Sequence, residues 1–160
     1  MSDFLAAYQI SRTRFEDEVK GLTQEQLNWR MQPDAMTIGE AAMHVAGAEV
    51  NFISQLLGLP LDAYAERLKK AATDGVVNDE PVPFSASEIA PSLVADALAF
   101  GRAMAEPIIS DPRDEIRAVV IKSVLGPMID GTGALARLAF HPAYHQGQIY
   151  LMKQSPGFPK

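Results

Sequence analysis

The chain has 160 residues, of which 48% are hydrophobic and 21% charged, and its formal net charge is −6 at pH 7. This length and composition are those of one globular domain, which we expect to cover residues 1–160. Because phosphate binding needs a basic surface, the acidic balance argues against nucleic acid as a partner. Cysteine is absent from the sequence, so disulfides and cysteine-ligated zinc are excluded and any thiol must come from a cosubstrate.

The N-terminal residues do not have the pattern of a signal peptide. Asp3 stands where such a peptide carries lysine or arginine, and no long apolar run follows. No later segment has the length of a membrane span. We therefore expect a cytoplasmic protein without a membrane partner.

The first predicted helix covers residues 3–21. Its inner residues recur at steps of three or four, which is the spacing of one face of an amphipathic helix. The expected stripe consists of Phe4, Tyr8, Ser11, Phe15, Val19 and Leu22. Arg12 falls outside the stripe and is expected on the polar side. Ser2 or Asp3 can cap the start of this helix, and Gly21 suits its end.

The second long helix is predicted at residues 37–57. Thr37 followed three residues later by Glu40 is a capping-box pattern, which marks a helix start. Gly58 is a typical residue just beyond a helix end. His44 lies at the edge of the apolar stripe of this helix, between small residues that leave room for an imidazole ring.

Three shorter stretches connect the long helices. A helical turn is expected at residues 23–27, and a polar surface helix at about 61–72. The stretch 73–84 contains Gly75, Asn78, Pro81 and Pro83, which favour turns, so it is predicted to be a loop. A loop of this length is either a lid, a pocket wall or a plain crossover between helices.

The third long helix is expected to open at Ser85, where Ser85 and Glu88 repeat the capping-box pattern, and to stop before Pro112. Its expected inner residues are Ile89, Leu93, Ala97, Phe100 and Met104. The β-branched residues between 113 and 124 favour an irregular or extended connection over a helix.

The last long helix is expected from Asp130 to about Lys153. One of its faces carries Leu138, His141, His145, Ile149 and Met152, with Arg137 and Gln148 beside it. Four long amphipathic segments with one long crossover and a short extra helix predict an all-α four-helix bundle.

His141 and His145 are two of the three histidines in the chain. Residues four apart lie on the same face of a helix, so both imidazoles can share one cation through Nε2 or Nδ1. Together with His44 they would leave at least one coordination position open, as catalytic metal sites do. Pro142 stands where zinc proteases have glutamate directly after the first histidine, which argues against a metalloprotease.

Two residues of this segment are unusual inside a helix. Pro142 removes one helical hydrogen bond and is expected to kink or widen the helix, which either re-aims His141 or is simply tolerated. Gly147 is less favourable than alanine in a helix, which suggests close contact between its backbone and a neighbour.

Polar residues near the histidines have competing interpretations. Glu40 can hold the His44 ring through its second nitrogen, or it can cap the helix, and we favour the cap. Glu49, Tyr144 and Gln148 can face either the pocket or water, and the sequence assigns none of them as a catalytic acid or base.

The segment TIGEAAMHVAGAE around His44, followed by a histidine pair in HPAYHQGQ, resembles the DinB-like (DinB/YfiT) superfamily, and the order of helices matches as well. The resemblance implies a four-helix bundle, usually dimeric, with a divalent metal ion such as nickel or zinc held by His44, His141 and His145. Two residues depart from the family pattern: Gln146 replaces a frequent arginine, and Pro142 follows the first ligand of the pair.

The superfamily includes S-transferases that use low-molecular-weight thiols, a thiol-dependent isomerase and proteins described as metal-dependent hydrolases. We therefore expect a metal-dependent enzyme acting on a small molecule, with thiol-dependent S-transfer first and hydrolysis second, in a homodimer. The alternative is a non-catalytic dimeric helical bundle with a structural or vestigial metal site. An open coordination position that faces a solvent-connected pocket would favour the enzyme.

Overall fold

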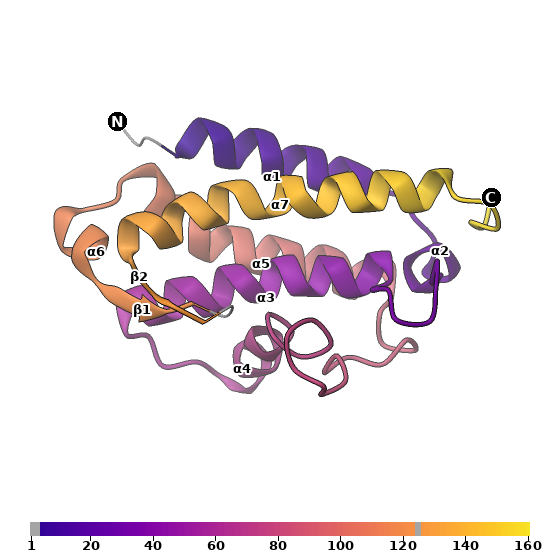
Figure 1. Ribbon diagram of the computed structural model, residues 1–160, viewed down its shortest axis with the longest axis horizontal. Helices are drawn as coiled ribbons and strands as arrows, with labels where there is room; N and C mark the ends of the chain where they lie inside the picture. The colour runs from indigo at the N-terminus through magenta and orange to yellow at the C-terminus, as the bar shows by residue number, and fades with distance from the viewer. Residues whose placement is uncertain (1–3, 124–125) are drawn as a thin grey trace.

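The computed structural model describes residues 4–123 and 126–160. Its main elements are the long helices α1 (Leu5–Val19), α3 (Ile38–Leu57), α5 (Pro91–Ser110) and α7 (Gly131–Gln154). The chain runs in one direction in α1 and α7 and in the opposite direction in α3 and α5 (Figure 1). Helix α1 packs chiefly on α7, and α3 chiefly on α5. The predicted all-α bundle with one long crossover, here between α3 and α5, is confirmed.

The shorter elements are α2 (Gln24–Asn28), α4 (Ala63–Lys70), α6 (Asp114–Ala118), β1 (Val120–Lys122) and β2 (Met128–Asp130). The two strands pair antiparallel, with Ile121 opposite Ile129. Among the helices that the structure describes, none is long and apolar enough to cross a membrane.

The stretch expected to be irregular or extended is extended only in its second half. Its first half forms α6, which carries Asp114 and Glu115 in its first turn, where acidic side chains suit the positive end of a helix. Ile116 anchors this helix in the core. Val124, the last residue of the expected stretch, lies outside the described residues.

Side-chain caps fix several of the predicted helix boundaries. The Thr37 hydroxyl accepts from the Glu40 backbone N–H at 3.1 Å, and the Glu40 carboxylate accepts from the Thr37 N–H at 2.7 Å. Thr23 and Gln26 form a second capping box at the start of α2. Gly58 follows α3 with φ of 60°, in the left-handed region that favours glycine. The predicted starts and ends of α3 are therefore confirmed.

Helix α5 begins at Pro91, so the predicted start at Ser85 is wrong. The backbone N–H and the hydroxyl of Ser85 both donate to the Glu88 carboxylate, but these bonds close an isolated turn. Pro91 takes the first helical position, where a missing N–H costs no hydrogen bond. The buried face consists of Val94, Ala97, Leu98, Gly101, Ala105 and Ile109. Three residues of the expected stripe are only partly buried: Leu93, Phe100 and Met104.

Helix α1 keeps most of its predicted inner stripe, since Tyr8, Ser11, Phe15 and Val19 are all buried. Phe4 holds the position before its first turn, and the expected caps, Ser2 and Asp3, lie outside the described residues.

Arg12, expected on the polar side of α1, is instead fully buried. Its Nε and Nη2 donate to the two carboxylate oxygens of Glu49 at 2.8 and 3.3 Å, and Nη2 also donates to the Leu98 carbonyl at 2.6 Å. The Tyr8 hydroxyl donates to the same carboxylate at 2.8 Å. Burial opposes the charged form of Arg12, but the Glu49 carboxylate outweighs burial and raises the pKa of the guanidinium. We call this cluster of Tyr8, Arg12 and Glu49 the buried charge network.

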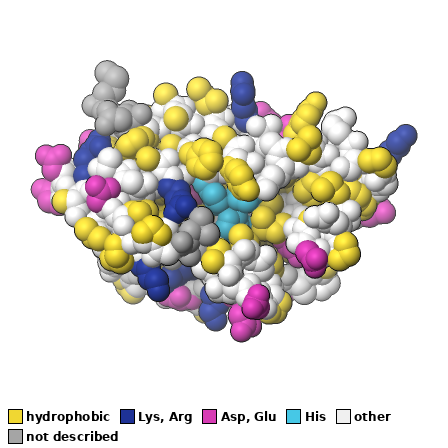
Figure 2. All heavy atoms as spheres, in the orientation of Figure 1, with side chains coloured by type: hydrophobic (Ala, Val, Ile, Leu, Met, Phe, Trp, Pro, Cys, Tyr) yellow, Lys and Arg dark blue, Asp and Glu magenta, His cyan; other side chains and the backbone are white. Residues whose placement is uncertain are grey.

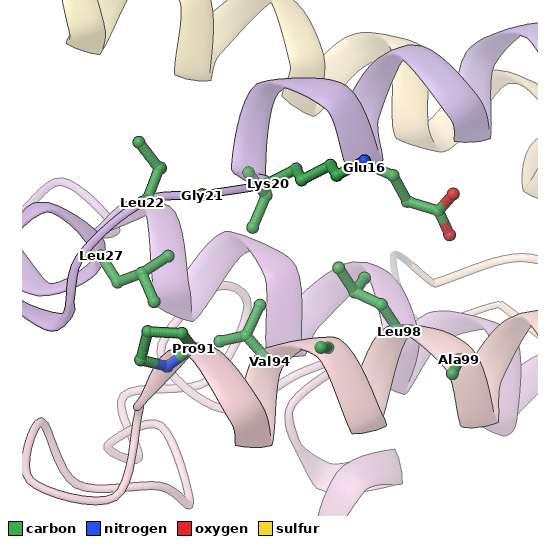
Figure 3. A pocket seen from close by; sticks show the side chains of 11 residues that line it. Glu16, Lys20, Gly21, Leu22, Leu27, Pro91, Val94, Leu98 and Ala99 are labelled. Carbon is green, nitrogen blue, oxygen red and sulfur yellow. The ribbon is translucent and has the colours of Figure 1, made fainter.

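The surface formed by the described residues includes two hollows that could bind a ligand. One opens over α3 and α7, and histidine side chains are visible inside it (Figure 2). The other has a volume of about 280 Å³ and lies between the end of α1 and the first half of α5 (Figure 3). The Glu16 carboxylate at its edge is already paired with Arg12 and Arg102, each at 2.9 Å. The second hollow is otherwise lined mainly by apolar side chains, so the first is the candidate for chemistry.

We predict that Glu49→Gln lowers the free energy of unfolding by about 3 kcal/mol, because the buried Arg12 charge loses its carboxylate partner. Equilibrium urea unfolding near neutral pH measures this change. Glu66→Gln is the matched control, since it removes a half-exposed carboxylate 3.8 Å from Lys69. The control should change the free energy by less than about 0.5 kcal/mol. Equal effects of the two substitutions would contradict the prediction.

Candidate metal centre

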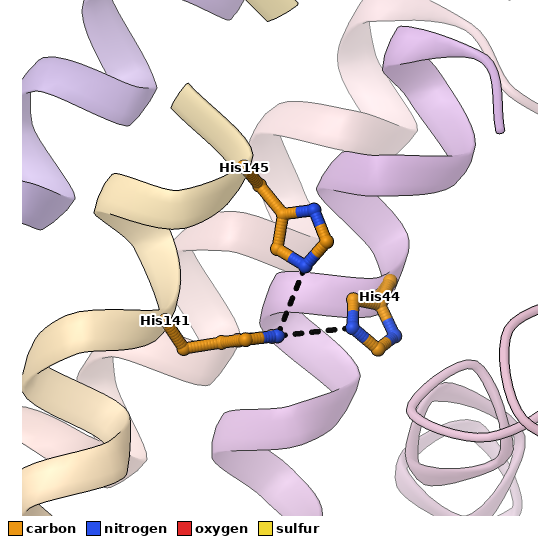
Figure 4. Close-up of side chains that lie close together, drawn as sticks. All are labelled: His44, His141 and His145. Atoms are coloured by element: carbon orange, nitrogen blue, oxygen red, sulfur yellow. Dashed lines mark hydrogen bonds between the residues drawn. The ribbon is translucent and has the colours of Figure 1, made fainter. Parts of the chain in front are cut away.

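The three histidines meet between α3 and α7 (Figure 4). His44 lies in the first half of α3, and His141 and His145 lie on successive turns of α7. The Nε2 atom of His141 is 3.0 Å from Nε2 of His44 and 3.0 Å from Nε2 of His145. One ligand atom from each ring lies within 4.8 Å of the others. The structure therefore brings together the three side chains that the sequence selected.

The outer nitrogens of two rings have partners that fix the proton positions. Nδ1 of His44 donates to the Ala71 carbonyl at 3.1 Å, and Nδ1 of His145 donates to Oε1 of Gln148 at 2.8 Å. With these protons on Nδ1, both neutral rings present an Nε2 lone pair to His141. The Nε2 of His141 can donate to one of these lone pairs at most. A cation would satisfy all three nitrogens at once, so the donor set fits a metal ion.

Glu40 does not hold the His44 ring. Its carboxylate caps Thr37 and pairs with Arg30 at 2.7 Å, so the cap interpretation is confirmed and the alternative role is wrong. Glu49 does not face the pocket either, because it belongs to the buried charge network. The ring partner of His44 is a main-chain carbonyl, which no side-chain pattern in the sequence can reveal.

A close approach of two helices places that carbonyl beside His44. A Cβ atom on Gly47 would overlap the Leu68 carbonyl oxygen and crowd the backbone nitrogen of Ala72. The end of α4 therefore rests directly on the backbone of α3, about one turn beyond His44. Glycine at position 47 thus allows the Ala71 carbonyl to reach the imidazole.

Pro142 and Gly147, the two residues that are unusual inside a helix, both lie in α7. Pro142 is buried within α7, which continues past it, and the Ser11 hydroxyl donates to the Ala139 carbonyl nearby at 2.7 Å. The predicted kink or widening stays a prediction. The predicted close contact at Gly147 is wrong for the described residues, because beyond the adjoining backbone of α7 none of their atoms lies within 4 Å of the position that a Cβ would take.

The histidine cluster lines a pocket of about 320 Å³ that we call the histidine pocket. Its lining residues come from α3, from the stretch that follows α4 and from α7: His44, Ala48, Phe52, Ala72, Val76, Val77, Arg137, Phe140, His141, Tyr144 and His145. The imidazoles can be seen from outside at the bottom of this hollow (Figure 2). Val76 and Val77 belong to the 73–84 loop, so of its three interpretations the pocket wall is confirmed.

Burial favours the neutral form of these histidines. It lowers the pKa of His44, against the opposing effect of a hydrogen bond to a carbonyl. Burial and the nearby His44 lower the pKa of His145 to about 4. Burial, followed by the charges of both other histidines and Arg137, holds the pKa of His141 well below its usual range. Neutral imidazole is the form that binds metal ions, so the three rings are in the form that could bind a metal ion near neutral pH.

A model of the DinB superfamily matches residues 7–149, a range that includes all three histidines. The chain belongs to the DinB superfamily. A comparison with curated protein sequences returned no match.

Two solved structures resemble this DinB superfamily chain in fold. A conserved protein from Enterococcus faecalis aligns with a TM-score of 0.68 at 20% identity, over 94% of this chain and 95% of that chain. A DinB-like protein from Bacillus cereus aligns with a TM-score of 0.64 at 21% identity, over 98% of this chain and 94% of that chain. At such identities the likeness shows the fold alone.

We predict that the metal-free protein loses stability with acid partly through His145. Its pKa of about 4 in the folded state lies below its ordinary value, so the unfolded chain takes up the proton first. The stability contributed by the neutral ring is present above about pH 6.5 and is lost as the pH falls towards 4. Urea unfolding in the presence of chelator measures this effect. Between about pH 6.5 and 4, the free energy of unfolding should fall by on the order of 2 kcal/mol more for wild type than for His145→Gln. Parallel pH curves for the two proteins would show that the ring does not contribute.

Proposed function

We propose that this DinB superfamily protein is a metal-dependent enzyme that acts on a small molecule, with thiol-dependent S-transfer as its first candidate reaction and hydrolysis as its second. The observation that carries the proposal is that one ligand nitrogen from each of three histidines lines a pocket open to solvent. Three protein ligands leave coordination positions for a substrate, and the pocket gives access to them. A structural or vestigial site, the alternative, would be better served by a fourth ligand or a sealed core.

A divalent ion, nickel or zinc, would supply Lewis acidity at this site, which favours the thiolate form of a thiol and the hydroxide form of water. The thiol would be a low-molecular-weight cosubstrate, since the chain has no cysteine. The chain itself holds the rings: the Ala71 carbonyl orients His44, and Gln148 orients His145.

The pocket lining supports S-transfer ahead of hydrolysis. Among the described lining residues, Arg137 and Tyr144 are the polar groups besides the histidines, so no carboxylate lines the pocket to act as a base. A thiol, with an ordinary pKa of about 8.5, needs less help from a protein base than water does. A thiol-conjugation screen of the metal-loaded protein, with varied thiols and electrophiles, tests the reaction.

We predict that His145→Ala abolishes retention of nickel or zinc, because it removes one of three ligands. Gln148→Ala should weaken metal binding by about tenfold or more, since such partners orient a ligand ring. Gln146→Ala is the matched control: it removes a neighbouring amide that donates a hydrogen bond to Glu18 of α1 at 3.5 Å, and it should leave the metal affinity unchanged. Titration calorimetry on the three variants measures these affinities. Wild-type affinity in His145→Ala would refute the assignment of this ligand.

Chelation separates a catalytic metal from a structural one. If the metal is catalytic, the chelated protein should still unfold in one cooperative thermal transition, because the apolar stripes supply most of the stability. A shift of several degrees fits either role, since any ligand of the native state stabilises it. Loss of the cooperative transition would assign the metal a structural role.

We also propose a homodimer that uses the outer face of α7. Phe140, Tyr144 and Leu151 are exposed by 62%, 53% and 64%, and their spacing places them on one side of the helix. Gly147 lies on the same side with open space above it, so a partner helix can approach closely. Large apolar side chains gathered on one surface are typical of interaction sites.

We predict that Leu151→Glu converts this dimer to a monomer, because it places a charge in the apolar contact. Light scattering across micromolar concentrations measures the mass. Met128→Glu is the matched control, since Met128 is equally exposed at 61% but lies on β2. A monomeric wild type, or a dimer that survives Leu151→Glu, would count against the proposed interface.

A further inference from the structure

We propose that the histidine pocket takes a small organic carboxylate whose charged group is bound by Arg137 and whose body is apolar. This inference rests on the proposed function, because it takes the histidine pocket to be the substrate site. It goes further in naming the chemical class of the substrate and the residue that selects it.

The position of Arg137 places a positive charge beside the histidines. It precedes His141 by four residues on α7, so the two side chains lie on the same face of the helix. Arg137 lines the histidine pocket and is partly buried. The space-filling view shows basic side chains next to the hollow in which the imidazoles lie (Figure 2).

Arg137 differs from other arginines of the bundle in its partners. Arg12, Arg67 and Arg102 each pair with a carboxylate, at 2.8, 2.7 and 2.9 Å. For Arg137, within the part of the chain that the structure describes, the side-chain contact is a hydrogen bond from Nη1 to the Ser123 hydroxyl. A guanidinium has five N–H donors in a planar fork, so donors remain for a ligand. This fork matches the two oxygens of a carboxylate.

The rest of the pocket sets the character of the ligand body. Its apolar walls are formed by Ala48, Phe52, Val76, Val77 and Phe140. Among the described lining residues there is no carboxylate, so an anion meets no repulsion, while a cation would meet the arginine. A volume of about 320 Å³ lies at the lower end of ligand sites, which limits the ligand to a small molecule. Arg137 is the one cationic side chain among the described lining residues, so the side chains of the pocket match a ligand with one carboxylate group.

The test measures binding to the full-length metal-free protein, so it needs no activity. Benzoate is the probe, and benzamide is its neutral counterpart of similar shape. Calorimetry or ligand-observed NMR near pH 8 compares them, because free imidazole, with a pKa of about 6.5, is neutral there. Wild type should bind benzoate about tenfold or more tightly than benzamide, as expected for a hydrogen bond to a charged group.

Three variants assign this preference to one side chain. Arg137→Met should abolish the preference, and Arg137→Lys should keep part of it, because lysine retains the charge but not the fork. Arg14→Met is the matched control: it removes an exposed arginine on α1 outside the pocket, and should bind benzoate as wild type does. Circular dichroism of each variant checks that the fold is kept.

Two outcomes would overturn the inference: wild type binds benzoate no more tightly than benzamide, or Arg137→Met keeps the full preference. A separate titration with nickel tests the proposed function, since Arg137→Met should bind nickel with wild-type affinity. If wild type binds no nickel but its benzoate preference depends on Arg137, the proposed function fails and the carboxylate site stands. If wild type binds nickel but has no preference for benzoate, the carboxylate site fails and the proposed function stands.

Discussion

A buried guanidinium joins three of the four bundle helices. Arg12 of α1 bonds both carboxylate oxygens of Glu49 on α3 and the Leu98 carbonyl on α5. Ser11, next to it, donates to the Ala139 carbonyl and so connects α1 to α7. Apolar stripes hold the helices together but tolerate small changes in side-chain packing. A buried charge, in contrast, destabilises the fold unless its hydrogen-bonding partners are in place. We infer that this network specifies how the helices align, and therefore where their side chains meet.

The histidine centre depends on that alignment. His44 on α3 and the pair on α7 face each other only because the two helices pass at the level of these residues (Figure 4). The crossover from α3 to α5 then completes the site. The carbonyl of Ala71, at the end of α4, accepts a hydrogen bond from the His44 ring, and the loop that follows supplies Val76 and Val77 as one wall of the pocket. Because α3 and α5 run in the same direction (Figure 1), the crossover must return the chain to the end of the bundle where α3 begins, and it also forms part of the pocket.

Local sequence patterns predicted the helices well where residues close along the chain decide the structure. They failed where the same sequence pattern is compatible with two different structures. The Ser85 and Glu88 pair looks like the cap of α3, yet it closes a turn, because Pro91 provides a better first residue for the helix. Gly147 in a helix suggested a close neighbour, but on this helix it lies on the outer face. A glycine by itself does not tell which side of a helix is covered.

The sequence by itself determined what is decided within one or two helical turns. The cap at Thr37 and the shared face of His141 and His145 follow from helix geometry alone. Only the tertiary structure decided that Arg12 is buried and that a main-chain carbonyl orients His44. The carboxylate partner of Arg12 is 37 residues away along the chain, and the carbonyl partner of His44 is 27 residues away. A polar side chain can be buried only where its partners satisfy it, so its position depends on contacts that no local pattern contains.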